Sequence, residues 1–303
     1  MSYLFSANIE VISEFNYSQT ETIVPKKPLT IHKKSVIIKK KRVKKVVKKK
    51  IIVKNKNLKK SKQVKKNIKQ TIKDKKIVKK RVKKVMNKSI KPKLVIIIDD
   101  ISHKYQLNYI KSLPFKVTPS IFPPSKMNMH SNKLAKGLKH FMVHLPLQSD
   151  SRAMNRMHKT LFITDSKIKI KNRVLEIKKL FPNVKYINNH TGSVFTKNYK
   201  KSKELYSYLL KNGIKFVDSR TTQKTVFPKL AKEFKQKYYK NDLFIDNKID
   251  TNAIIKKIKF AIKLAKKRGY AVIIGHPHHQ TFKALKLSEK YLKNINVIYI
   301  DEL

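Results

Sequence analysis

The sequence predicts an α/β domain of barrel type over residues 94–303. Two observations carry this prediction: uninterrupted β-branched runs recur along this part of the chain, and helical patterns separate them about seven or eight times. Such runs are typical of strands buried on both faces of a parallel sheet, and the number of repeats suits a (β/α) barrel, complete or one strand short. A doubly wound open sheet remains the alternative, because the period alone does not show closure.

The first predicted strand, 94–98, begins shortly after Pro92, a residue that disfavours helix in the position before it. Gly213 and Gly269 follow two helical patterns where a left-handed C-terminal cap belongs. The other predicted strands are 115–122, 141–145, 184–187, 214–217, 243–245, 271–274 and 297–300. The predicted helices are 105–112, 131–138, 166–180, 199–212, 228–239, 252–268 and 285–294.

The net charge of +56 is unevenly placed, since residues 26–93 hold 32 Lys or Arg and a single acid, Asp74. Such a block repels itself and buries too little apolar surface to fold alone. We therefore expect a disordered or conditionally helical linker, 26–93, between an N-terminal segment of unknown role, 1–25, and the domain 94–303. The linker could contact an anionic membrane or another polyanion as a basic amphipathic helix. No specific nucleic-acid motif is present, and an AT-rich genome would also favour this composition.

Cysteine is absent, which excludes a disulfide framework and a thiolate metal site. Glu10 and Glu14 interrupt the apolar start of the chain, which also lacks a basic first region, so it makes a poor signal peptide. No window reaches the roughly 18 uncharged apolar residues of a membrane span. We expect that the protein stays inside the cell or that its export signal lies outside this reading frame.

Polar residues follow six of the predicted strands. The carboxyl ends of parallel strands meet at one rim of a barrel or sheet, which is where functional residues belong. A single Asp or His at a strand end is more often structural, but six such groups on one rim indicate a site. The groups are Asp99–Asp100, His144, 188–193, 218–222, Asp246–Asn247 and 275–278.

These residue types suit hydrolysis assisted by a metal. One carboxylate and two imidazoles can hold a divalent ion of the zinc kind with a position left open for water. The ion lowers the pKa of that water and polarises a carbonyl, a second carboxylate can accept the water's proton, and another His can protonate a leaving amine. The set predicts cleavage of an amide such as N-acetyl. A retaining glycosidase with Asp99 and Asp218 as carboxylates about 5 Å apart is the alternative.

The ordered motifs resemble the divergent polysaccharide deacetylase family over roughly residues 94–303. The resemblance implies a distorted (β/α)7 barrel with a zinc-type ion, a glycan substrate that loses acetyl groups, and a place in the periplasm or cell envelope. The motifs are Ile97–Ile101, Val143–Leu147, Asn188–Ser193, Val217–Thr221, Phe244–Asn247 and Ile274–His278.

The resemblance also implies residue roles. Asp99 corresponds to the general base, Asp100 and His144 to metal ligands, and His276 to the catalytic acid. Either Asp218 or Arg220 would orient the base or balance its charge. The oligomeric state is not predicted.

In the wider superfamily a second metal-binding His lies four residues after the first, and this sequence has Gln148 there; the divergent family often has Glu near this position, and that match is absent too. An amide oxygen is a poor zinc ligand, so His190 on the adjacent strand is predicted to replace it. The alternative is a weakly active or inactive barrel that binds glycan, held at an anionic surface by its basic tail. The predicted substrate contacts are Asn188, Asn189, Ser193 and His278. Asp246 could either stabilise a loop or contact the metal. Four histidines are predicted to be surface residues: His103, His130, His140 and His158.

Overall fold

The structure is a computed structural model, and it describes residues 91–303. The predicted N-terminal segment, 1–25, and nearly all of the predicted linker, 26–93, lie outside the described residues. Within 91–303, every helix is too short or too polar to cross a lipid bilayer.

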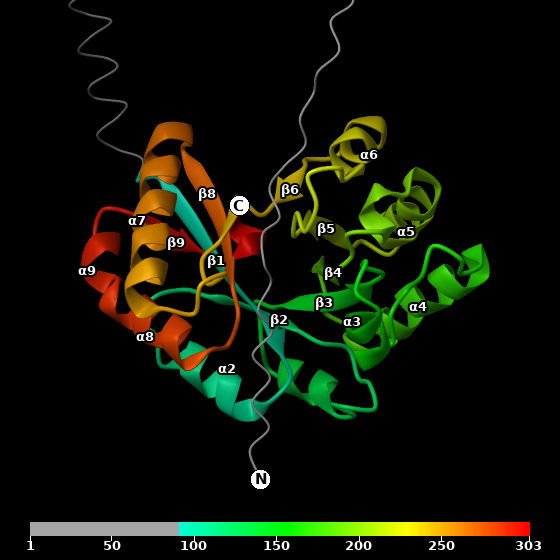
Figure 1. The fold of residues 1–303 in the computed structure, drawn as a ribbon, viewed down its shortest axis with the longest axis horizontal. Helices are drawn as coiled ribbons and strands as arrows, with labels where there is room; N and C mark the ends of the chain where they lie inside the picture. The colour runs from blue at the N-terminus through cyan, green and yellow to red at the C-terminus, as the bar shows by residue number, and fades with distance from the viewer. Residues whose placement is uncertain (1–90) are drawn as a thin grey trace, which may run out of the picture. The chain divides into compact units, whose positions relative to one another are not determined.

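Nine parallel strands form one curled sheet in the described part of the chain (Figure 1). The order of its strands is β6-β5-β4-β3-β2-β1-β8-β7, and β9 pairs with the first half of β1. The strands are β1 (Lys93–Ile101), β2 (Thr118–Ile121), β3 (Met142–Leu147), β4 (Tyr186–Thr191), β5 (Lys215–Asp218), β6 (Tyr239–Lys240), β7 (Leu243–Phe244), β8 (Tyr270–Gly275) and β9 (Asn296–Ile298).

One short segment, 239–244, joins the two edges of this sheet. Its first part, β6, pairs with β5, and its second part, β7, pairs with β8. Between them, the Asn241 N–H donates to the Asp218 carbonyl and the Asp242 N–H donates to the Val272 carbonyl. The sheet therefore curls round on itself, which confirms the predicted distorted barrel rather than the doubly wound open sheet.

The α-helices lie outside the curled sheet (Figure 1). Side chains of Ser166, Asn198 and Asp250 cap the starts of three of them by accepting backbone N–H groups. The α-helices are α2 (Lys104–Lys111), α3 (Arg152–Met157), α4 (Lys167–Leu180), α5 (Tyr199–Lys211), α6 (Phe227–Glu233), α7 (Thr251–Arg268), α8 (His279–Leu287) and α9 (Glu289–Leu292), and the 3₁₀ helices are η1 (Ser131–Ala135), η2 (Phe195–Lys197) and η3 (Ile300–Glu302).

Three helical predictions differ from the structure. The helix predicted over 131–138 is the short 3₁₀ helix η1, and the one predicted over 285–294 begins earlier, at His279. The helix predicted over 228–239 stops at Glu233, because Lys235 adopts a left-handed φ of 53° and the Gln236 N–H donates to the Ala231 carbonyl. This is the capping geometry that usually uses glycine.

The core has two layers, separated by the sheet. The larger layer packs the outer face of the sheet against the helices. The smaller layer, which we call the inner cluster, fills the curl of the sheet. Its buried members are Val95, Ile97, Met142, Tyr186, Val217, Tyr239, Val272, Ile274, Ile298 and Ile300. The inner cluster forms the floor on which the candidate site is built.

Candidate active site

Strand alternation places one polar layer directly above the inner cluster. Side chains two residues apart on a strand face the same side of the sheet. Inner-cluster residues on five strands are therefore followed, two positions later, by polar residues that also face inward. These are Asp99, His144, Asn188, Ser219 and His276, after Ile97, Met142, Tyr186, Val217 and Ile274.

Asp100 joins this layer by breaking the alternation. In a regular strand its side chain would point away from that of Asp99. Its φ of 58° lies in the left-handed region, and the register of β1 against β2 shifts between Ile98 and Ile101. Such a backbone conformation costs a non-glycine residue about 1–3 kcal/mol. This left-handed conformation of Asp100 brings two consecutive carboxylates, those of Asp99 and Asp100, to the same side of the sheet.

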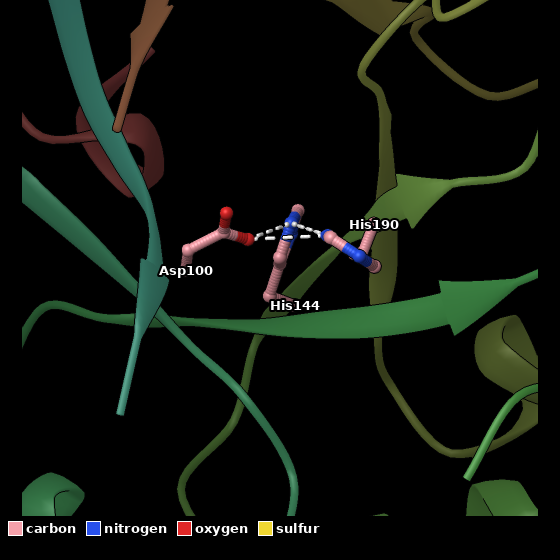
Figure 2. Close-up of side chains that lie close together, drawn as sticks. All are labelled: Asp100, His144 and His190. Carbon is pink, nitrogen blue, oxygen red and sulfur yellow. Dashed lines mark hydrogen bonds and ion pairs between the residues drawn. The ribbon is translucent and has the colours of Figure 1, made fainter. Parts of the chain in front are cut away.

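Asp100, His144 and His190 converge from three strands, β1, β3 and β4, with their side chains pointing toward one another (Figure 2). Asp100 Oδ1 lies 3.1 Å from His144 Nε2 and 3.1 Å from His190 Nδ1. The two ring nitrogens are 3.2 Å apart. The three atoms thus form a nearly equilateral triangle at the mouth of the curled sheet.

Asn188 connects this triangle to the second carboxylate, Asp99. Its Nδ2 donates to both oxygens of Asp99 at 2.8 and 3.0 Å and lies 3.1 Å from Ser219 Oγ. Its Oδ1 accepts from Ser120 Oγ at 2.6 Å and lies 2.9 Å from His144 Nδ1. His144 must donate its Nδ1 proton to this oxygen. In a neutral ring, Nε2 then directs a lone pair toward Asp100 and His190. Burial lowers the pKa of His144, but the charge of Asp99 and the hydrogen bonds with Asp100 and Asn188 outweigh it and raise the pKa, so the ring without a cation favours a second proton, on Nε2.

The triangle fits a small divalent cation. Ligands at about 2.0–2.1 Å around a tetrahedral ion are separated by about 3.3 Å, close to the 3.1–3.2 Å between these three atoms. Without a cation or an added proton, the unprotonated Nε2 of His144 would face carboxylate lone pairs. A carboxylate with two imidazoles is also a common zinc ligand set. The residues present therefore suit the ion that the sequence predicts.

Electrostatics distinguish the two carboxylates. Burial raises the pKa of Asp99, and the opposing effects of His144, His276 and the Asn188 hydrogen bond do not cancel it. Burial also acts to raise the pKa of Asp100, but hydrogen bonds from His144 and His190 hold it well below its usual range. Asp100 is therefore anionic, as a cation ligand must be, whereas Asp99 is the more basic of the pair.

His276 is held by Asp246 on the far side of the site. Asp246 Oδ1 lies 3.0 Å from His276 Nδ1, and Oδ2 accepts from the His276 backbone N–H and from Thr281 Oγ1. Burial lowers the pKa of His276, but the hydrogen bond with Asp246 and the charges of Asp100, Asp246 and Asp99 outweigh it and raise the pKa to about 9. Asp246 thus fixes the ring and keeps it protonated at neutral pH.

Asp218 and Arg220 are not placed as the predicted partners of Asp99. Asp218 accepts from the Arg220 backbone N–H, from Thr225 Oγ1 and from Tyr238 Oη, each at 2.8 Å. The Arg220 side chain bonds to Gln223. Among the described residues, the side-chain hydrogen-bond donor to Asp99 is Asn188. The retaining-glycosidase alternative also loses support, because the Asp218 carboxylate already accepts hydrogen bonds from Arg220, Thr225 and Tyr238.

The predicted substrate contacts have different placements. Asn188 and Asn189 are buried, with 0% and 1% exposure. Asn189 Oδ1 accepts a hydrogen bond from the Ser219 N–H, so both amides form hydrogen bonds with buried groups of the protein. Ser193 Oγ donates to Asp150 at 2.6 Å and connects the loops that follow β3 and β4. His278 is half-buried, with its ring centre 6.2 Å from that of His276.

Gln148 does not point into the triangle as a ligand would. Its side-chain Oε1 accepts the Ile163 backbone N–H at 2.9 Å, and its backbone N–H donates to the Leu161 carbonyl. His190 supplies the imidazole instead, because the parallel register of β3 and β4 sets it opposite Pro146. This geometry agrees with the prediction that His190, and not the residue at position 148, supplies the second imidazole.

Two aromatic residues at the site were not anticipated. Phe122 lies among His144, His190 and His158, with ring centres 5.1, 4.9 and 4.1 Å away. His158, predicted to be a surface residue, is half-buried: its ring stacks on Phe122, and its centre is 5.4 Å from that of His190. Burial and the neighbouring His190 lower the pKa of His158 to about 4.

The fold and the site define an α/β barrel with an Asp–His cluster at the carboxyl ends of its strands. The chain matches the divergent polysaccharide deacetylase family over residues 96–303, and it belongs to this family. This confirms the resemblance on which the sequence-based roles depend.

Two curated relatives and one solved structure share this domain. The chain is 30% identical over 196 residues to an uncharacterized protein of Haemophilus influenzae, covering 64% of this chain and 70% of that one. It is 27% identical to the uncharacterized protein YibQ of Escherichia coli, covering 64% of this chain and 61% of YibQ. The crystal structure of the uncharacterized protein ATU2773 of Agrobacterium tumefaciens superposes with a TM-score of 0.62 at 15% identity, over 71% of this chain and 89% of that one. This last likeness is one of fold.

Proposed function

We propose that the domain is a metal-dependent hydrolase that removes acetyl groups from a glycan. The observation that carries this proposal is the triangle of Asp100, His144 and His190, with ligand atoms 3.1–3.2 Å apart beside a separate buried carboxylate. Family membership supports the same reaction class. A divalent cation of the zinc kind is the ion that this ligand set favours.

The residues around the triangle have the properties that amide or ester hydrolysis requires. A bound cation supplies an acidified water and polarises the acetyl carbonyl. Asp99, with its raised pKa, accepts the proton of the attacking water, while Asn188 holds its two oxygens in place. His276 donates a proton from Nε2 to the departing nitrogen or oxygen of the sugar, because its Nδ1 is held by Asp246. The products are acetate and the free amine or hydroxyl.

Metal content and acetate release test the proposal together. The full-length chain should bind one zinc ion, and its melting temperature should rise on zinc binding and fall again in chelator. Zinc-loaded protein should release acetate from N- or O-acetylated oligosaccharides. His190→Ala should lose both properties, whereas His140→Ala, which alters a histidine paired with Asp301 away from the site, should keep both.

Two results would contradict the proposal. Absence of a stoichiometric ion, with a melting temperature that chelator leaves unchanged, would remove the metal. One bound ion with binding of acetylated oligosaccharides but no release of acetate would instead favour an inactive glycan-binding barrel. Contact of residues 26–93 with an anionic membrane or polyanion is a separate proposal. It predicts salt-dependent binding that deletion of that segment abolishes.

A further inference from the structure

His190 and His158 each have a buried ring nitrogen without a hydrogen-bond partner among residues 91–303. These atoms are Nε2 of His190 and Nδ1 of His158. An unpaired buried polar atom typically costs about 1–3 kcal/mol, so two of them on adjacent rings require an explanation. The rings are nearly perpendicular, at 81°, and their centres are 5.4 Å apart.

The two nitrogens have complementary capacities. His190 directs Nδ1 toward Asp100 and His144. When Nδ1 holds a cation, the proton of the neutral ring must reside on Nε2, which then needs an acceptor. His158 offers Nδ1 as that acceptor when its own proton is on Nε2. One ring therefore has a donor without an acceptor, and its neighbour has an acceptor without a donor.

His158 is also held in place firmly enough to act on its neighbour. Its ring stacks on Phe122, with centres 4.1 Å apart and planes at 19°. The segment after it is attached to the end of β3: Leu161 bridges Leu147, and the Ile163 N–H donates to Gln148 Oε1 at 2.9 Å. Gln148 thus holds the segment that carries His158.

We propose that His158 is a positioning residue for the cation ligand His190. Its Nδ1 accepts a hydrogen bond from the Nε2–H of His190, directly or through one water, and so keeps Nδ1 of His190 aimed at Asp100 and His144. The inference rests on the proposed function, because it gives His190 a cation to bind. It adds a residue of the loop after α3 to the set that determines cation affinity.

His158→Phe tests the inference because it keeps the stacking on Phe122 and removes the acceptor. Competitive zinc titration of the full chain against a chromophoric chelator should show affinity reduced by about 10- to 100-fold, the usual effect of losing a partner of a metal-bound imidazole. His158→Gln, whose amide oxygen can accept a hydrogen bond, should recover part of the loss. The zinc affinity of His158→Gln also tests the inference if the His158→Phe variant fails to fold.

His140→Phe is the matched control. His140 is another partly buried histidine, and its ring stacks on that of Tyr299 with centres 4.0 Å apart. It lies in the segment before β3 and forms an ion pair with Asp301. Its replacement should leave zinc affinity unchanged. A ¹⁵N-edited NMR spectrum of the zinc-loaded wild type should contain a slowly exchanging His190 Nε2–H signal, which His158→Phe should lose.

The outcomes separate this inference from the proposed function. Weaker zinc binding in His158→Phe, with unchanged melting of the zinc-free protein and no change in the control, supports the inference. Zinc binding by His158→Phe equal to that of the wild type overturns it and leaves the proposed function standing. A wild type that binds no zinc overturns both.

Discussion

Replacing Asp246 by Asn should lower the pKa of His276. The hydrogen bond with Asp246 is the largest effect that opposes burial in setting this pKa, and the charge of Asp246 adds to it. The rise from the ordinary value of 6.5 to about 9 corresponds to about 3 kcal/mol in favour of the imidazolium. The charges of Asp99 and Asp100 remain in the variant. We therefore expect the pKa to fall by roughly 1–2, to between about 7 and 8.

This change has a defined effect on activity. If the pKa of His276 moves from about 9 to about 7.5, the imidazolium fraction at pH 8.5 falls from about three quarters to about a tenth. Because His276 must donate a proton, the basic limb of the kcat/KM profile should move to lower pH by the same interval. Activity at pH 6.5 should be reduced much less.

NMR titration of His276 in chelator measures the pKa without relying on turnover. The control is Thr281→Val, which removes one hydrogen bond to Asp246 but keeps its charge and its contact with the ring. A His276 pKa in Asp246→Asn that stays near the wild-type value would refute the reasoning.

The same pKa gives a check on stability. Because the folded-state pKa of His276 is raised, its stabilising effect is complete below pH 6.5 and is lost as the pH rises through about 9. Asp246→Asn should therefore lower the free energy of unfolding more at pH 6 than at pH 10. An equal loss at both values would mean that Asp246 acts only as a structural clamp.

Three further substitutions test the packing of the site. Asn188→Ala leaves the partners of its amide unpaired, so urea unfolding should show a loss of about 2–4 kcal/mol; a loss below about 1 kcal/mol would contradict the network. Asp99→Asn removes a buried charge whose pKa is raised, so the metal-free variant should melt at a higher temperature than the wild type at pH 7.5, and the difference should shrink as the pH falls toward 3.8; a lower melting temperature at pH 7.5 would contradict this. Gly192→Ala puts a Cβ 3.1 Å from Leu147 Cβ at a φ of 96°, so chemical unfolding should show a loss of about 1–3 kcal/mol, and an unchanged midpoint would show that this turn can relax.

Most of the fold could be predicted because the barrel depends on patterns that are local in sequence. The β-branched runs around Leu94 and Ala271 became β1 and β8, and the Gly269 cap follows α7 as expected. The prediction of where α6 ends failed because its end signal uses an unusual residue. Lys235 occupies the left-handed position that ends α6, and lysine gives no sequence signal for it.

The sequence predicted that the polar residues at the strand ends gather on one rim of the barrel. It did not lead us to predict which face of its strand each side chain occupies. Asp218 is the last residue of β5 and Ser219 follows it; Ser219, two positions after the inner-cluster residue Val217, is the one of the two that contacts Asn188. Alternation from Val217 could have indicated this. His158 could not be placed in this way, because its position depends on the bridge between Leu147 and Leu161, which no short motif reveals.

The position of Gln148 links these features. The wider superfamily places an imidazole there, four residues after His144, yet the parallel register sets His190 opposite Pro146, close enough to complete the triangle. In the proposed site the second imidazole comes from β4, and the amide of Gln148 instead holds the segment that follows His158. The proposed roles of His190 and His158 are therefore physically connected, because Gln148, which does not face the triangle, anchors the loop that lies beside His190.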